Sequence, residues 1–220
     1  EIERTATSDS AAACFFSGYD CDSLAFEPVT GFVDHILPVF ERLPNAWLEL
    51  RTKSTQVRSL RLREALPNCV VAFSLSPEAI GEALEHKVPP LSKRLDVLTD
   101  LAARGWKIGL RFDPLIDCPD FHETYRELFE SVFRRVPEES VHSVSLGPFR
   151  LPRDFYKTAV KQYPDEPLFA AAVEDHAGMV SYPREREREL VAFATEELAG
   201  FVPEERFFPC QLEETDSSDA

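Results

Sequence analysis

Apolar and polar positions alternate along the chain in blocks that predict strands and helices in turn. Five short runs rich in Val, Ile, Leu and Phe have the pattern of strands, and the segments between them have the wider spacing of helices. Near-continuous apolar runs are typical of strands buried on both faces of a parallel sheet. The runs are AAACFFSG (11–18), AWLELRTK (46–53), VVAFSLS (70–76), WKIGLRFDPLI (106–116) and VHSVSLGPFR (141–150).

The clearest helical segment is 119–136, where apolar side chains recur at the 3.6-residue period of one helix face. A second spans 91–101, with Gly105 as a stop signal beyond its end. A third covers 29–40, and Pro38 inside it predicts a kink or a break. The pattern also predicts a short helix at 152–163 and a charged helix that opens within 183–190.

The order of strand and helix, repeated about five times, predicts an α/β fold with a parallel sheet, either a barrel or a doubly wound sheet. Five strands fall short of the eight that close a barrel. No domain boundary is visible before about residue 165, so residues 1–164 form the predicted barrel domain. We expect residues 165–205 to be an extension that packs on the barrel, and residues 206–220 to be an acidic, disordered tail.

Composition narrows the classes of partner. The chain has 220 residues, of which 44% are hydrophobic, enough to bury a core. Its net charge of -15, from 24 Lys and Arg against 39 Asp and Glu, repels nucleic acid backbones unless cations gather in one place. The segment 51–63 does gather five cations without an acid, so a nucleic acid partner stays open as a weaker alternative.

The termini and the apolar runs bear on location. No apolar run reaches the roughly 18 residues of a membrane span, and the first twelve residues are polar and small, unlike a signal peptide. We therefore expect a cytoplasmic protein that does not contact a membrane. The chain begins at Glu1 and its one methionine is Met179, so we expect it to be part of a longer polypeptide. The pattern does not determine the oligomeric state.

The residues that most often hold metals are scattered. The cysteines, Cys14, Cys21, Cys69, Cys118 and Cys210, show no C-x-x-C spacing, and the five histidines show no H-x-x-x-H or H-E-x-x-H spacing. We therefore expect idle or buried thiols and no metal site built from this chain. The G-x-S-x-G, P-loop and G-x-G-x-x-G signatures are also absent, so hydrolase and nucleotide kinase functions lack support.

Polar residues follow each predicted strand at the point where the strand ends. In parallel α/β folds the carboxyl ends of the strands meet at one rim, where ligands bind. Mixed charges at this rim suit an anionic or zwitterionic small molecule, such as one with a carboxylate and an amine; ordinary solvated loop residues are the alternative. The candidates are Ser17 to Asp22, Arg51 and Lys53, Ser74 and Ser76, Arg111 and Asp113, and Arg150.

The basic segment 51–63 divides at this rim. Lys53 ends a predicted core strand and belongs to the candidate site. The residues that follow predict a helix whose Leu60 contacts the core. We expect the arginines at 58–63 to face solvent or nearby acids rather than to form a nucleic acid patch.

Five segments of the chain occur in an order that matches a known family. They are GYDCDSLAFEPVTGF (18–32), LELRTKS (48–54), VVAFSLSPEAI (70–80), PPLSKRLDVLTDLAARGWKIGLRFDPLI (89–116) and SVSLGPFRLP (143–152). Together they resemble the spore photoproduct lyase-like branch of the radical S-adenosylmethionine enzymes. The similarity runs from about residue 13 to residue 192, and its specificity comes from five motifs in register.

The resemblance implies a partial (β/α)6 TIM-type barrel with parallel strands that lacks its first strand. It also implies S-adenosylmethionine and a [4Fe–4S] cluster, which generate a 5′-deoxyadenosyl radical; the spore enzyme uses this radical to reverse a thymine dimer lesion in DNA. In the family, three cysteines of a C-x-x-x-C-x-x-C loop hold the cluster. Cys14 and Cys21 have no third cysteine nearby. An absent upstream segment would therefore supply the loop, and this chain alone would be inactive.

The resemblance assigns some residues directly. Lys53 matches a family lysine that contacts the S-adenosylmethionine carboxylate, and Ser74 matches a serine at the same ligand. Gly18 and Tyr19 occupy the place of the G-G-E-like motif that binds the methionine amine, although that motif is degenerate here.

The hydrogen-donor position departs from the spore enzyme. The family places a cysteine three residues before an aspartate; if Asp22 is that aspartate, Tyr19 takes the cysteine's place and Cys21 lies one residue before it. This departure and the net charge argue against DNA lesion repair, and the substrate is not defined. We take Tyr19 and Cys21 as catalytic candidates. The cofactor-binding candidates are Gly18, Asp22, Lys53, Ser74, Ser76, Arg111 and Asp113.

Two hypotheses therefore lead, and a nucleic acid module stays as the weaker third. In the first, the chain is the barrel portion of a radical S-adenosylmethionine enzyme. In the second, it is a degenerate, non-catalytic ligand-binding or interaction module on the same barrel.

Overall fold

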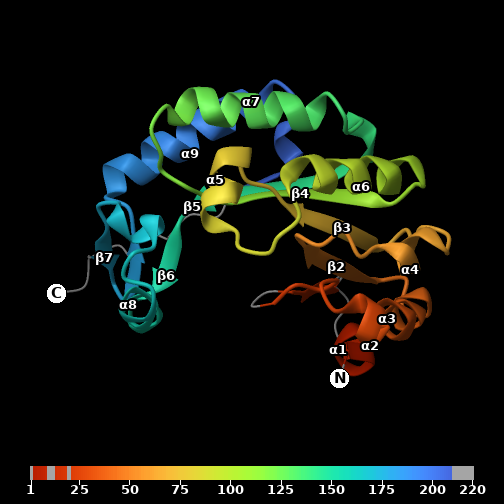
Figure 1. The fold of residues 1–220 in the computed structure, drawn as a ribbon. Helices are drawn as coiled ribbons and strands as arrows, with labels where there is room; N and C mark the ends of the chain where they lie inside the picture. Colours follow the sequence, from red (N-terminus) through yellow and green to blue (C-terminus); the bar gives the residue numbers. More distant parts are fainter. Residues whose placement is uncertain (1, 9–12, 19–20, 210–220) are drawn as a thin grey trace.

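The computed structural model describes residues 2–8, 13–18 and 21–209 (Figure 1). Its centre is a six-stranded sheet in the order β1-β2-β3-β4-β5-β9, with every neighbouring pair parallel. The sheet is curved and open, so the prediction of a partial parallel barrel is confirmed. The strands are β1 (Ala13–Ser17), β2 (Ala46–Thr52), β3 (Cys69–Ser74), β4 (Lys107–Leu115), β5 (Val141–Pro148) and β9 (Phe207–Pro209).

Helices connect the strands, and α6, α7 and α9 cover the convex face of the sheet (Figure 1). Crossover helices are what parallel neighbours require, because a tight turn cannot return the chain to the same end of the sheet. The helices are α1 (Ile2–Ser8), α2 (Glu27–Thr30), α3 (Phe32–Glu41), α4 (Arg58–Arg61), α5 (Glu78–Leu84), α6 (Leu91–Ala103), α7 (Phe121–Phe133), α8 (Arg153–Gln162) and α9 (Arg184–Ala199), with 3-10 turns at Glu138–Ser140, Pro167–Ala170 and Glu204–Arg206.

A small antiparallel sheet follows β5. Its order is β6-β8-β7, and it forms a lobe with α8 beside the open side of the barrel (Figure 1). The strands are β6 (Arg150–Pro152), β7 (Glu174–His176) and β8 (Met179–Ser181). The chain then returns through α9 to the convex face of the barrel, where α9 packs on α7 and β5.

The core lies between the convex face of the sheet and the helices. Alternate strand residues such as Leu50, Phe73 and Phe112 are fully buried there, and Tyr125 and Phe129 of α7 meet them. The concave face carries a different set of side chains. Glu49, Arg111, Ser143 and Ser145 on it are buried although they are polar. The concave face therefore mixes these polar groups with apolar residues such as Val70 and Ala72 of β3.

The five predicted strands are confirmed, with ends that move by a few residues at most. The predicted helix at 29–40 corresponds to α2 and α3, and α3 continues through Pro38. The sequence pattern did not reveal β9, whose three residues stand in the segment assigned to the acidic tail. Residues 210–220 of that segment lie outside the described residues.

None of the helices in the described ranges is long and apolar enough to cross a membrane.

Candidate functional site

A cavity of about 290 Å³ lies at the carboxyl ends of β1 to β4. Seven residues predicted for the rim line it, and Thr52 completes the lining. The predicted convergence of strand ends therefore occurs for these seven. They are Gly18, Cys21, Asp22, Arg51, Lys53, Ser74 and Asp113.

Gly18 allows the turn that follows β1. Its φ is +90°, and a Cβ at this position would lie 2.7 Å from Ser23 Oγ and 2.8 Å from the carbonyl oxygen of Arg51. A side chain would meet both the strained backbone region and the neighbouring strand. The turn thus approaches the end of β2 as closely as a glycine permits, and it places Cys21 at the cavity.

Asp22 joins this turn to the end of β2. Its Oδ1 accepts hydrogen bonds from the backbone N–H groups of Leu24 and Ala25, both at 2.8 Å, and from Thr52 Oγ1 at 2.7 Å. Its Oδ2 accepts one from the backbone N–H of Lys53 at 2.7 Å. Most of the hydrogen-bond acceptor capacity of the Asp22 carboxylate is therefore used to hold the loop. The capacity to accept a further hydrogen bond remains on Oδ2.

Lys53 reaches over the rim to a carboxylate that the sequence analysis did not select. Its Nζ donates to Glu85 Oε1 at 2.5 Å, and Ser76 Oγ donates to the same oxygen at 2.9 Å. Arg94 Nη2 donates to Glu85 Oε2 at 2.8 Å, and Arg94 Nη1 donates to the carbonyl oxygen of Ser74 at 2.9 Å. Ser76 is thus a partner of Glu85 and not part of the cavity lining.

The environment of Glu85 keeps it ionised. Burial acts to raise the pKa of this carboxyl, but the charge and hydrogen bond of Lys53, the charge of Arg94 and the hydroxyl of Ser76 outweigh burial. The net pKa of Glu85 is lowered. At neutral pH the group is therefore a carboxylate between two cations.

Arg111 lies beneath the rim, inside the open barrel. Its guanidinium donates to both carboxylate oxygens of Glu49, at 3.1 and 2.6 Å, and to the hydroxyl of Ser143 at 2.8 Å. A Cβ on Gly109 would lie 2.7 Å from Arg111 Nη2, so this glycine leaves space for the guanidinium. The structure does not bring Arg111 to the cavity, since it is 4% exposed and engaged with Glu49.

Asp113 and Arg150 close the side of the rim nearest the small lobe. Asp113 lines the cavity, and its Oδ2 lies 3.5 Å from Arg150 Nη2. The peptide bond between Asp113 and Pro114 is cis. Two of the mixed charges predicted at the ends of the fourth and fifth runs therefore lie next to each other.

One of the two catalytic candidates lines the cavity. Cys21 is an exposed free thiol that lines the cavity, whereas Tyr19 lies outside the described residues. No group of three or more His, Cys, Asp or Glu side chains in the described ranges could hold a metal ion. The described residues therefore do not fit an iron–sulfur cluster, which needs three thiolates together.

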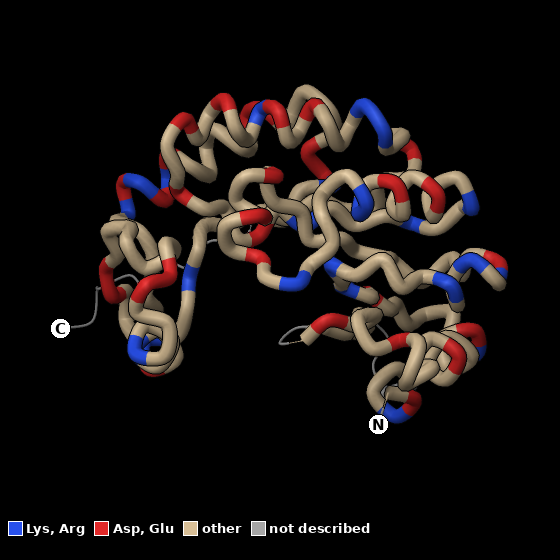
Figure 2. Tube along the Cα trace, in the orientation of Figure 1, with Lys and Arg blue, Asp and Glu red and all other residues tan. Residues whose placement is uncertain are grey.

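The arginines after Lys53 pair with acids on neighbouring helices. Arg61 Nε lies 2.6 Å from Asp100, and Arg63 Nη2 lies 2.7 Å from Asp34. Leu60 is fully buried, as predicted for its helix face. Figure 2 shows cationic and anionic positions interspersed along the chain rather than gathered on one surface. Arg58 is exposed, so the expectation that the arginines at 58–63 face solvent or nearby acids is confirmed.

Three residues that hold the site together were missed, namely Glu49, Glu85 and Arg94. The sequence carried a signal for Arg94, because this residue stands among the leucines of the apolar stripe of α6. In the structure Arg94 is 1% exposed. Glu49 gave a weaker one, as the single acid inside the apolar run AWLELRTK. Glu85 gave none, since it belongs to the mixed segment EALEHK (82–87), which overlaps the end of α5.

Fold and site together define a class of protein. The chain is an open parallel α/β barrel with a polar ligand cavity at the carboxyl ends of its strands. Within this class, it belongs to the spore photoproduct lyase family, because the family model described as Spore photoproduct lyase matches residues 5–178.

Individual relatives agree with this assignment. The spore photoproduct lyase of Bacillus subtilis (strain 168) is 26% identical over 98 residues, which is 44% of this chain and 29% of the relative. A spore photoproduct lyase double mutant, solved with bound AdoMet and dinucleoside spore photoproduct, has a TM-score of 0.82 at 16% identity, over 94% of this chain and 63% of that one.

A second solved structure, spore photoproduct lyase complexed with dinucleoside spore photoproduct, has a TM-score of 0.79 at 16% identity. It covers 96% of this chain and 64% of its own. At these identities the likeness shows the fold. The chain spans less than two thirds of the length of each of these relatives.

Proposed function

We propose that this chain is the S-adenosylmethionine-binding barrel portion of a radical S-adenosylmethionine enzyme of the lyase type, and that its rim cavity takes the amino acid end of the cofactor. One observation carries the proposal: seven predicted strand-end residues of a spore photoproduct lyase family member line one cavity. The volume of about 290 Å³ is near the lower limit of small-molecule sites, roughly 300–1,000 Å³. It suits the methionine portion, with the adenosine outside.

The charges of the cavity match a zwitterion. Lys53 would bind the carboxylate, with Ser74 beside it on β3. The lining holds two carboxylates, and because Asp22 is engaged with its loop, Asp113, beside Arg150, is the one that would attract the amine. The tight turn at Gly18 gives the ligand close access to the backbone. Cys21 faces the same space, which places a thiol where a hydrogen atom could pass to or from a substrate. Tyr19 is the other candidate for this role.

The described residues hold no cluster ligands, so reductive cleavage of the cofactor would depend on cysteines beyond them. We therefore propose that the 220-residue chain binds S-adenosylmethionine without cleaving it. The substrate of the whole enzyme is not assigned. A net charge of -15 and the pairing of Arg61 and Arg63 with acids speak against a DNA substrate of the spore lesion type.

Calorimetric titration of the chain with S-adenosylmethionine tests the proposal. We expect saturable binding that weakens about tenfold or more in Lys53→Ala, as the loss of a charge-assisted hydrogen bond predicts. Lys93→Ala is the matched control, because Lys93 is an exposed lysine on α6 away from the cavity. Absence of binding, or equal loss in both variants, would overturn the assignment of the cavity.

The second candidate, a non-catalytic ligand-binding module, is favoured by the lack of a cluster site in the described part of the chain. The two are separated by anaerobic reconstitution of a polypeptide that carries a C-x-x-x-C-x-x-C loop upstream of residue 1. Formation of 5′-deoxyadenosine in this sample supports the enzyme. If no such upstream sequence exists, binding without cleavage supports the module.

A further inference from the structure

Glu85 connects the cavity to the body of the barrel although it is not part of the cavity lining. Its carboxylate receives Lys53 from the end of β2, Ser76 from beyond β3 and Arg94 from α6. From this geometry we infer that Glu85 is a positioning residue, which orients the Lys53 ammonium toward the carboxylate of the ligand. The inference rests on the proposed function, because it names how the same site recognises an amino acid.

The ammonium of Lys53 has the donors that this role needs. It carries three N–H donors, and Glu85 takes one of them at 2.5 Å. The Lys53 side chain is 35% exposed while that of Glu85 is 9% exposed, so the ion pair has one open end. The two remaining donors are therefore available to a ligand at the end that lines the cavity.

Glu85 can orient Lys53 because Glu85 is itself fixed. Arg94, whose side chain is 2% exposed, binds the second carboxylate oxygen and also the carbonyl oxygen of Ser74. One buried guanidinium thus ties the partner of Lys53 to the strand end that carries Ser74. Holding a flexible lysine in its bound direction before the ligand arrives removes part of the entropy loss on binding.

The charge of the cluster gives a way to separate position from electrostatics. Lys53 and Arg94 carry two positive charges and Glu85 one negative charge, so the cluster has a net charge of one positive. Glu85→Gln would raise it to two. If Lys53 acted only as a charge, a ligand carboxylate would bind the variant more tightly. If Glu85 positions Lys53, the carboxylate binds less tightly in spite of the added charge.

Two probes isolate the contribution of the amino acid end. S-adenosylhomocysteine and 5′-methylthioadenosine share the thioether and adenosine and differ in whether the amino acid is present. We measure Kd for both by calorimetry and take the ratio of Kd for 5′-methylthioadenosine to Kd for S-adenosylhomocysteine. We expect Glu85→Gln to lower this ratio roughly tenfold. A general loss of structure would weaken both probes and leave the ratio unchanged.

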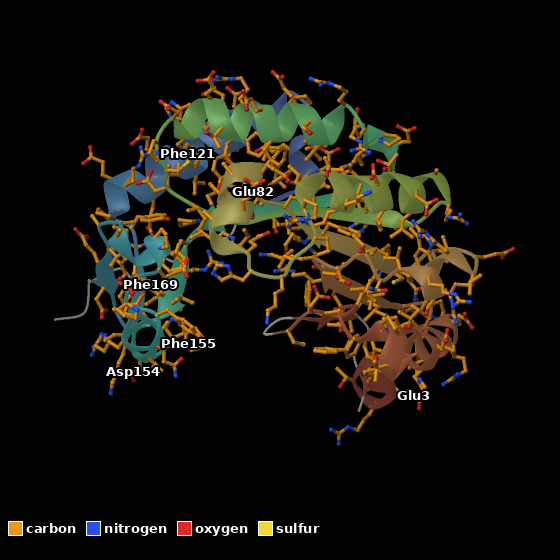
Figure 3. All side chains as sticks on the ribbon, in the orientation of Figure 1. Glu3, Glu82, Phe121, Asp154, Phe155 and Phe169 are labelled. Carbon is orange, nitrogen blue, oxygen red and sulfur yellow. The ribbon has the colours of Figure 1, made fainter. Side chains whose placement is uncertain are left out.

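Glu82→Gln is the matched control, because Glu82 is an exposed glutamate on α5 (labelled in Figure 3) and its loss changes the net charge equally. A double-mutant cycle adds Lys53→Met. If Glu85 acts through Lys53, its effect on the ratio disappears in the Lys53→Met background. If Glu85→Gln does not fold because Arg94 is left unpaired, Glu85→Asp keeps the charge with a shorter side chain and should still lower the ratio.

The outcomes separate this inference from the proposed function. A wild-type ratio near one overturns both, since the amino acid end then contributes nothing to binding. A high wild-type ratio that falls in Lys53→Met but persists in Glu85→Gln keeps the proposed function and overturns the positioning role. A ratio that rises in Glu85→Gln also overturns it, because Lys53 then acts by charge alone.

Discussion

Replacement of Glu49 by Gln tests the interior of the open barrel. Glu49 and Arg111 are 5% and 4% exposed, and two hydrogen bonds of 3.1 and 2.6 Å join them. The amide has nearly the same size, but it turns one acceptor into a donor and removes the counter-charge of a buried guanidinium. Loss of one partner of a buried ion pair costs about 3–5 kcal/mol. This is a large part of the roughly 5–15 kcal/mol that stabilises a domain.

Urea denaturation followed by far-UV circular dichroism measures the free energy of unfolding of the wild type and the variant. Glu130→Gln is the control, because Glu130 is 52% exposed and lies 3.9 Å from Arg134 one helical turn away. An exposed pair of this kind contributes only about 0.3–0.5 kcal/mol. If Glu49→Gln loses less than about 1 kcal/mol, water or another anion compensates Arg111, and Glu49 is not the buried counter-charge that stabilises it.

The same pair predicts a dependence of stability on pH. Burial acts to raise the pKa of Glu49, but the hydrogen bond and charge of Arg111 and the charge of Arg51 outweigh it, so the net pKa is lowered. In the unfolded chain the pKa of Glu49 is near 4.5, so the unfolded chain binds the proton more readily than the folded chain. The stabilisation from the ion pair is complete above the unfolded-state pKa and is lost as the pH falls through the lower pKa of the folded state. Glu49→Gln should therefore lose less stability between neutral pH and about pH 3.5 than the wild type does.

Two further predictions concern the turn and the cavity. Gly18→Ala should lower the free energy of unfolding by about 1–3 kcal/mol more than Gly178→Ala, because both have positive φ but nothing lies within 4 Å of a Cβ at Gly178; equal thermal melts would contradict the close approach to β2. Alkylation by iodoacetamide should be fastest at exposed Cys21, slower at Cys14, whose pKa burial and the charge of Glu49 raise, and very slow at buried Cys69, whose pKa burial raises to about 12. S-adenosylhomocysteine should protect Cys21 and not Cys14 in chymotryptic peptide maps, and equal protection would place the ligand elsewhere.

The strands could be predicted because their outward faces are apolar without interruption. Leu48 and Leu50 alternate with Trp47 and Glu49, yet the run still reads as one apolar block. That the second face is lined by buried polar groups does not follow from the pattern, because Glu49 is satisfied by Arg111, 62 positions away. The partner of a buried charge becomes known only when the register of the strands is known.

The strand β9 could not be predicted for a different reason. Phe207–Pro209 is too short for any alternation to be recognised, and an acidic segment follows it. It pairs with β5 because α9 returns the chain to the edge of the sheet. Tertiary contact rather than local propensity makes it a strand, as is common for short edge strands.

Some of the predicted rim residues line the cavity and others do not, for a related reason. A strand end predicts where a side chain begins but not where its functional group lies. Lys53 and Ser74 point into the cavity, whereas Arg111 turns inward to Glu49 and Ser76 turns to Glu85.

The basic segment 51–63 shows why charge along a sequence is a poor guide to a binding surface. Five cations without an acid suggested a patch for an anionic polymer. In the fold, Arg61 pairs with Asp100 of α6 and Arg63 with Asp34 of α3, both acids contributed from distant parts of the chain. Lys53 and Arg51 differ because both line the cavity. Lys53 shares Glu85 with Arg94, and Arg51 shares Glu49 with Arg111, so each cluster keeps a net positive charge. Of the cations of this segment in the described structure, these two are therefore the ones whose surroundings favour an anionic ligand.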